Sequence, residues 1–193
     1  MNFVKSKTFS AAIAVLAIGI FAMGASPAQA ADSTAQSAEE TSCWYDFTSG
    51  QSLCVGEDES LIDALDAAGV HLNVPDGTVI AGEKVSANTS ASRSATAAAS
   101  STVVAILYDD VNYGGGSFVF TGVSTGCASY AYGAPALSTY GWNDRASSYR
   151  SFAGCKSAVF EHENYTGAQY GYSVNATGFG VMNDKASSWR ISA

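Results

Sequence analysis

The chain has 193 residues, of which 17 are Asp or Glu and 9 are Lys or Arg, so its formal net charge at pH 7 is −8. An acidic chain without a basic cluster repels phosphate backbones, which excludes nucleic acid as an expected partner. The length leaves room for one domain of ordinary size, or for a smaller domain with an appendage.

The first 30 residues have the pattern of a secretory signal peptide. Lys5 and Lys7 form a positive start, the run from Ala11 to Met23 is apolar, and Ala28-Gln29-Ala30 is a cleavage site of small residues. A transmembrane helix is the alternative, but the apolar run is shorter than the roughly 20 residues that span a bilayer. We therefore predict a secreted, extracellular protein with no membrane attachment after cleavage.

The four cysteines are expected to form two disulfides, because an even number in an exported chain favours disulfide bonds over metal thiolates. Three pairings are open from sequence alone. We favour Cys43 with Cys54 and Cys127 with Cys155, since each bridge then stays within one stretch of similar composition. A zinc site is not expected, because the sequence has no Cys-x-x-Cys motif and its two histidines stand apart.

Residues 31–84 form an acidic N-terminal region. The stretch from Cys43 to Phe47, followed by the turn residues Ser49-Gly50 and by Cys54, predicts a short cross-linked hairpin or loop. The alternative for its aromatic residues is an exposed contact surface. We favour the structural interpretation, because so small a unit needs both a covalent link and apolar side chains to bury.

A short helix and a linker complete this region. Apolar residues recur at helical spacing from Ser60 to Ala68, with Ser60 or the preceding Asp58 available as the N-cap. Residues 85–101 are almost entirely Ser, Ala, Thr and Asn, a composition typical of a flexible linker. We therefore expect the domain boundary in this linker, before a C-terminal domain at residues 102–193.

The C-terminal domain carries short β-branched and apolar runs separated by Gly, Asn and Ser turns. This pattern indicates an all-β sandwich or barrel rather than alternating helices and strands. The expected strands are residues 103–108, 117–121, 149–152, 158–160, 169–174 and 188–192. The two runs at 149–152 and 188–192 would each close a unit of four strands.

One arrangement occurs twice in this domain: an aromatic-glycine hairpin followed by the hexapeptide Asn-Asp-x-Ala-Ser-Ser, at residues 143–148 and 183–188. The hairpin residues Tyr108, Asn112, Tyr113, Gly115 and Phe118 return with identical spacing as Phe160, Asn164, Tyr165, Gly167 and Tyr170. A hairpin that folds back over its sheet needs a residue with positive φ and no Cβ, which Gly115 and Gly167 provide. The Asp carboxylate, the Ser hydroxyl and the carbonyls of each hexapeptide are hard oxygen ligands of the kind that calcium takes.

These two linked motifs resemble the βγ-crystallin family, whose calcium signature reads Asn/Asp-Asn/Asp-x-x-Ser/Thr-Ser. The resemblance covers residues 102–193 and implies two Greek-key motifs, at about 102–152 and 156–193, packed as one wedge-shaped sandwich. It also implies about two calcium ions, each held between the Ser-Ser loop of one motif and the hairpin turn of the other. Extracellular modules of this kind bind calcium with dissociation constants of roughly 10⁻⁴ to 10⁻³ M.

Carried over to this sequence, the resemblance implies two ligand sets. One consists of Ser187, the carbonyl of Lys185, Asp184 and a carbonyl near Val111; the other consists of Ser147, the carbonyl of Arg145, Asp144 and a carbonyl or carboxylate at Glu163. Ser148 and Ser188 are expected to be structural and to hydrogen-bond to the hairpin. The alternative is that both hexapeptides are turn and capping segments that hold no metal.

Other functions compete with a calcium-binding structural or binding module. Secreted bacterial metalloproteinase inhibitors resemble this fold, and their binding loop would here be Ser124–Tyr140, since the first motif carries extra residues around Thr125–Ser138. That family generally lacks the calcium hexapeptide, so we prefer the calcium module. Contact with a cell-wall or glycan component is also open, through rings that are either an exposed surface or core: Tyr130, Tyr132, Tyr140 and Trp142. No enzyme is expected, since the sequence has neither a Gly-x-Ser-x-Gly nor a His-Glu-x-x-His motif.

Overall fold

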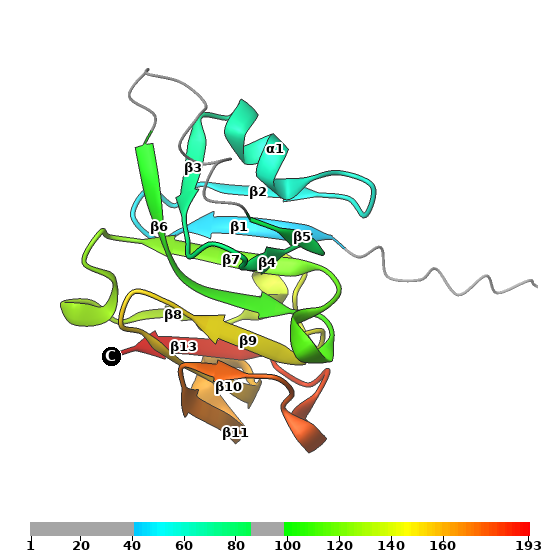
Figure 1. Ribbon diagram of the computed structural model, residues 1–193. Helices are drawn as coiled ribbons and strands as arrows, with labels where there is room; N and C mark the ends of the chain where they lie inside the picture. Colours follow the sequence, from blue (N-terminus) through cyan, green and yellow to red (C-terminus); the bar gives the residue numbers. More distant parts are fainter. Residues whose placement is uncertain (1–40, 86–98) are drawn as a thin grey trace, which may run out of the picture. The chain divides into compact units, whose positions relative to one another are not determined.

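The computed structural model describes residues 41–85 and 99–193, which form a mostly β structure with one short α-helix (Figure 1). The predicted signal peptide, the start of the acidic region and most of the predicted linker lie outside these residues. Across the two described ranges, no helix is long and apolar enough to cross a membrane.

The N-terminal region contains the predicted cross-linked hairpin and the predicted helix. Its elements are β1 (Ser42–Asp46), β2 (Ser52–Val55), α1 (Leu61–Ala67), β3 (Val70–Asn73), β4 (Val79–Ile80) and β5 (Glu83–Lys84). In the β1–β2 hairpin, Cys43 lies opposite Cys54 and the two form a disulfide. The helix begins after Ser60, whose Oγ accepts a 3.2 Å hydrogen bond from the backbone N–H of Asp63. Both predictions are confirmed.

The C-terminal domain consists of two four-stranded motifs. The first contains β6 (Ala99–Tyr108), β7 (Ser117–Gly122), β8 (Tyr132–Ala134) and β9 (Ser148–Ser151). The second contains β10 (Lys156–His162), β11 (Thr166–Ser173), β12 (Asn175–Ala176) and β13 (Ser188–Ser192). Single 3-10 turns lie at Val111–Tyr113, Gly126–Ala128, Leu137–Tyr140, Glu163–Tyr165 and Gly180–Met182.

Each motif contributes its third strand to the sheet of the other motif. One sheet has the order β12-β9-β6-β7, and the second has the order β11-β10-β13-β8. Strand β12 thus leaves the second motif to pair with β9, and β8 leaves the first motif to pair with β13. This exchange ties the two motifs into one sandwich, as the predicted Greek-key fold requires.

The N-terminal region extends the first of these sheets. Strand β1 pairs in parallel with the free edge of β7, and β3 pairs in parallel with the start of β6 (Figure 1). The predicted linker is therefore wrong for Ala99–Ser101, which are the first residues of β6 and lie beside Val70–Leu72. Composition alone suggested a flexible segment, but these small residues pair with the backbone of β3 and so form a strand.

Two apolar clusters follow from this arrangement. The first fills the sandwich between the two sheets and contains six large buried rings: Phe118, Phe120, Trp142, Tyr149, Phe179 and Trp189. The second lies on the other side of the first sheet and joins N-terminal to C-terminal residues, among them Trp44, Leu61, Leu65, Ile80, Val103, Ile106 and Val119. Because both faces of β6 are covered, Val103 to Tyr108 are all buried.

Candidate functional site

The two aromatic-glycine hairpins fold back as predicted, each pinned by the second serine of its own hexapeptide. In the first motif, Ser148 Oγ donates to the carbonyl of Asp110 and accepts from the N–H of Tyr113, at 2.5 and 3.1 Å. In the second motif, Ser188 Oγ bonds in the same way to His162 and Tyr165, at 2.6 and 3.0 Å. The predicted structural role of these two serines is confirmed.

The glycine of each hairpin is needed for two reasons. Gly115 has a φ of 69°, and a Cβ there would lie 3.0 Å from Asp109 Cβ. Gly167 has a φ of 80°, and a Cβ there would lie 2.8 Å from the His162 ring. A side chain at either position would therefore push the hairpin off its sheet.

The two hexapeptides lie side by side and bond to each other reciprocally. The N–H of Asp144 donates to the carbonyl of Ala186 at 3.0 Å, and the N–H of Asp184 donates to the carbonyl of Ala146 at 3.2 Å. Both aspartates adopt the left-handed conformation, with φ of 55°. This backbone pairing turns each aspartate side chain toward the opposite hexapeptide.

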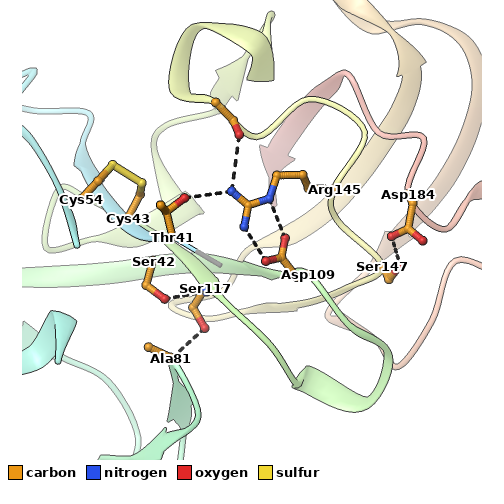
Figure 2. Close-up of polar contacts among 11 residues, drawn as sticks. Thr41, Ser42, Cys43, Cys54, Ala81, Asp109, Ser117, Arg145, Ser147 and Asp184 are labelled. Atoms are coloured by element: carbon orange, nitrogen blue, oxygen red, sulfur yellow. Dashed lines mark hydrogen bonds and ion pairs between the residues drawn. A yellow bond between two sulfur atoms is a disulfide. The ribbon is translucent and has the colours of Figure 1, made fainter. Parts of the chain in front are cut away.

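The first serine of each hexapeptide consequently meets the aspartate of the other one. Ser147 Oγ donates to Asp184 Oδ1 at 2.7 Å (Figure 2), and Ser187 Oγ lies 3.3 Å from Asp144 Oδ1. Ser187 Oγ also donates to the carbonyl of Glu161 at 2.8 Å. Both serines are buried whereas both aspartates are exposed.

The contacts of the two hexapeptides group these residues differently from the predicted ligand sets, whose binding of calcium stays a prediction. Asp184 was expected beside Ser187, and Asp144 beside Ser147, but the structure exchanges the two aspartates. The serines also lie against the hairpins of their own motifs, since the N–H of Ser147 donates to Tyr108 and that of Ser187 to Phe160, both at 2.9 Å. The physical reason is that the strand ladder fixes each serine within its motif, while the hexapeptide pairing moves each aspartate across.

The predicted hairpin ligands have other partners. The carbonyl of Val111 accepts from the N–H of Gly114 at 3.4 Å, and the carbonyl of Glu163 accepts from Thr166 Oγ1 at 3.0 Å. The carboxylate of Glu163 accepts from Ser138 Oγ at 2.6 Å. In the described part of the chain, neither residue hydrogen-bonds to the serine with which it was grouped. The hairpin oxygen beside Ser187 is instead the carbonyl of Glu161.

We call the two clusters of oxygen atoms the first site and the second site. The first site contains Ser147, Asp184 and the base of the first hairpin, where the N–H of Ser147 donates to the carbonyl of Tyr108, the residue before Asp109. The second contains Ser187, Asp144 and the base of the second hairpin, where Ser187 Oγ donates to the carbonyl of Glu161. Hydroxyl, carboxylate and carbonyl oxygens of mixed charge fit a hard cation such as calcium. Over residues 41–85 and 99–193, no group of three or more His, Cys, Asp and Glu side chains gathers as a metal cluster, so most donors at either site would be neutral. The carbonyls of Arg145 and Lys185 follow directly after the two aspartates in sequence.

Sequence reasoning missed the side chain of Arg145. Its Nε donates to Asp109 Oδ1 at 3.0 Å, its Nη2 donates to Asp109 Oδ2 at 2.5 Å, and its Nη1 donates to Thr41 Oγ1 at 2.9 Å (Figure 2). The guanidinium also lies 4.4 Å from the centre of the Trp142 ring. The signal for this contact was weak, because an acid and a base 36 positions apart are common in any sequence.

The inserted loop of the first motif is held by the second predicted disulfide, Cys127–Cys155, which is confirmed. The aromatic residues of this loop divide between surface and core. Tyr130 is 55% exposed, Tyr132 and Tyr140 pack against the main core, and Trp142 is fully buried. Of the four rings considered for a glycan surface, only Tyr130 is mainly accessible.

Comparisons with known proteins give solved structures only. No protein-family model matches the chain, and no curated protein matches it. A doubly substituted βγ-crystallin domain from Clostridium beijerinckii is 32% identical, in a match that covers 46% of this chain and 96% of that chain with a TM-score of 0.37. A βγ-crystallin domain from Flavobacterium johnsoniae is 29% identical, covering 47% and 94% at 0.36, and a βγ-crystallin from Ciona intestinalis is 26% identical, covering 44% and 94% at 0.34.

Proposed function

Because the chain belongs to the βγ-crystallin family through the domain that β6 to β13 form, we propose that it is a secreted, non-enzymatic module that binds about two calcium ions. The ions would be held at the first and second sites, and the module would serve a structural or binding role outside the cell. The two disulfides support an oxidising compartment.

One observation carries this proposal: a buried serine hydroxyl of each motif meets an exposed aspartate of the other motif. The two oxygens are 2.7 Å apart at the first site and 3.3 Å apart at the second. A calcium ion with ligands at about 2.3 to 2.6 Å would replace the hydrogen bond in each pair, and the serine hydroxyl would keep its proton and turn it away from the ion. Each ion would then join the two motifs, so calcium would stabilise the sandwich as a whole.

Calorimetric titration of the metal-free protein with calcium tests the proposal. We expect about two ions bound, and at 100 times the dissociation constant the folded state gains roughly 2.7 kcal/mol. For a chain of this size that gain raises the melting temperature by roughly 5 to 10 °C. The double variant Asp144→Ala with Asp184→Ala, which leaves no side-chain oxygen at either position, should lose both effects. Asp58→Ala, which removes an exposed carboxylate outside the sites, should keep them. The absence of both heat and a thermal shift in the natural protein would refute the proposal.

Proteinase inhibition is a second candidate, favoured by the disulfide-pinned loop between β7 and β8. Tyr132 OH bonds to the N–H of Val123 and to the carbonyl of Gly126, at 3.2 and 3.1 Å, which braces the loop beneath the exposed Tyr130. A rigid loop that presents one accessible ring suits a surface that inserts into a partner. Micromolar protein should then slow a thermolysin-like metalloproteinase, and Tyr130→Ala should weaken the effect. Unchanged proteolysis across metallo- and serine proteinases would remove this candidate.

A further inference from the structure

The two sites differ in one charged contact, although their hexapeptides differ at a single position, Arg145 against Lys185. Arg145 forms a two-pronged ion pair with Asp109, the acidic residue at the base of the first hairpin. Both side chains are mostly buried, with 17% and 13% of their surface exposed. Salt screens a partly buried pair less than an exposed one, so the positive charge is fixed beside the first hairpin.

The equivalent contact is missing from the second motif. Lys185 is exposed and forms no ion pair with any residue in the described ranges. Glu161, which takes the place of Asp109, accepts a 3.3 Å hydrogen bond from the N–H of Ala168, whereas Asp109 accepts from a guanidinium. The second hairpin therefore carries one more uncompensated negative charge at this position than the first.

A glycine makes room for the contact in the first motif. A Cβ at Gly116 would lie 2.8 Å from Asp109 Oδ2, 3.0 Å from the carbonyl oxygen of Thr41 and 3.5 Å from Arg145 Nη2. The second motif has Ala168 at the equivalent place and has no such ion pair. The ion pair is therefore accommodated by the backbone beneath it and is not an incidental surface contact.

The same guanidinium reaches the N-terminal region. Arg145 Nη1 donates to Thr41, the residue before β1, and the next residue, Ser42, accepts from the N–H of Ser117 on β7 at 3.1 Å. Figure 2 shows the guanidinium turned toward Thr41 and Asp109, while Ser147 and Asp184 meet on the other side of the Arg145 backbone. The Arg145 side chain thus forms no hydrogen bond with the pair of Ser147 and Asp184, but it compensates the negative charge of the Asp109 carboxylate.

We propose that Arg145 sets the calcium affinity of the first site, so that the second site fills first and the first site binds more weakly. This inference rests on the proposed calcium function. The other acidic groups near the hairpins do not reverse it: the carboxylate of Asp110 lies over Gly115, and Glu163 adds negative charge beside the second hairpin. One uncompensated unit charge near a divalent ion corresponds to a difference in affinity on the order of tenfold.

Single-site variants of the full chain separate the two sites for calorimetric titration with calcium. Asp144→Ala leaves only the first site, and Asp184→Ala leaves only the second. We expect the first site alone to bind about tenfold more weakly than the second. Adding Arg145→Gln should then raise the affinity of the first site about tenfold and change the second site by less than about twofold.

Two controls keep the result specific. Lys156→Gln removes an equal charge from the far end of β10 and should change neither site by more than about twofold. Asp109→Asn, combined with Arg145→Gln, should cancel the gain, because the released carboxylate is the source of the added affinity. Circular dichroism at each step checks that the variants stay folded.

The same titrations distinguish a failure of the calcium function from a failure of the role of Arg145. Calcium binding that is absent in the natural protein and in every variant removes the calcium function, and this inference with it. Two ions bound with equal affinity, or an Arg145→Gln variant that leaves the first site unchanged, would overturn the role of Arg145 and leave the calcium function standing.

Discussion

The outer faces of the two Greek-key motifs differ, although their strands follow the same order. Strand β7 is buried along all six residues, whereas its counterpart β11 is exposed at every residue but the last. The N-terminal region causes this difference, because β1 pairs with the edge of β7 and its apolar residues pack on the outer face of β6 and β7. One half of the sandwich is covered and the other half is not.

The side chains of the two faces match their surroundings. On the covered face, Ile106 and Val119 are fully buried, and the equivalent residues of the second motif are Ala158 and Gly171. At these two pairs of positions, the larger apolar group occurs in the motif that another segment covers, which agrees with the cost of exposing apolar surface. The N-terminal region is therefore part of the folded unit, since without it the first motif would expose an apolar sheet face.

Hydrogen bonds also hold the N-terminal region, residues 41–85, in one register against the first motif; we call this region the cover. Trp44 on β1 donates through its indole N–H to Thr121 Oγ1 on β7 at 3.0 Å, and both residues are buried. The hydroxyl of Tyr108 donates to the carbonyl of Val79 at 2.9 Å, and burial raises the pKa of Tyr108 well above its ordinary value. These bonds satisfy groups that would otherwise be buried without a partner.

The largest effect is expected from Trp44→Ala, which removes the main ring of the cover. The variant leaves a cavity beside β7 and an unpaired hydroxyl at Thr121, and we expect it to lower the free energy of unfolding by about 3 to 5 kcal/mol. Urea denaturation measures the loss.

Tyr172→Ala on the bare strand β11 is the matched control for that measurement. Tyr172 is 43% exposed, so its truncation should cost less than about 1 kcal/mol. Trp44→Phe should fall between the two, since a smaller phenyl ring still fills part of the space while the hydrogen bond to Thr121 is lost. Equal losses for Trp44→Ala and Tyr172→Ala would show that the cover adds no stability to the first motif.

Removal of each disulfide is expected to give the next largest losses of unfolding free energy. One disulfide lies in the cover and the other in the sandwich, so the two losses can be compared. Cys127–Cys155 closes 28 residues and ties the inserted loop to the start of β10, whereas Cys43–Cys54 closes 11 residues within the cover. Restriction of the unfolded chain then predicts losses of about 3 to 4 and about 3 kcal/mol, respectively, for paired Cys→Ala variants. Urea denaturation of each pair checks the order, and a larger loss for the shorter loop would contradict this explanation.

Local pattern predicted much of the fold. The run at Ser188–Ser192 is β13 as found, the hairpin glycines were predicted from spacing, and the disulfide pairing that composition favoured among three is the one present. The partners of strands β1 and β3 could not be predicted, because the sequence of a short apolar run does not indicate which strand it pairs with far away in the chain.

The candidate site was predictable by residue type but not by grouping. Asp144, Ser147, Asp184 and Ser187 do converge, yet two near-identical hexapeptides cannot reveal which serine meets which aspartate. The exchange depends on backbone bonds between the hexapeptides, and these arise only once both motifs have folded. The ion pair of Arg145 with Asp109 depends in turn on Gly116, because a side chain there would collide with Asp109. This requirement is visible only once the packing around Gly116 is known.

The smallest effect concerns pH, at the contact where the cover meets the first motif. The ring of Tyr140 lies 5.2 Å from that of Tyr45 on β1, and burial, together with the interaction with Tyr45, raises the pKa of Tyr140 to about 12. An unfolded tyrosine has a pKa of about 10, so the folded state favours the neutral ring. The resulting stability is complete below about pH 10 and is lost as the pH rises toward 12.

Tyr140→Phe removes this dependence, because phenylalanine does not ionise. Between pH 8 and pH 11, the variant should lose less unfolding free energy than the natural protein, by under about 1 kcal/mol, since the ring is partly solvated. Urea denaturation at the two pH values measures the difference, and Tyr172→Phe on the bare β11 serves as the control that should not change it. If both variants behaved like the natural protein, the contact between Tyr140 and Tyr45 would not shield the Tyr140 hydroxyl from water, and this explanation of the pH dependence would be wrong.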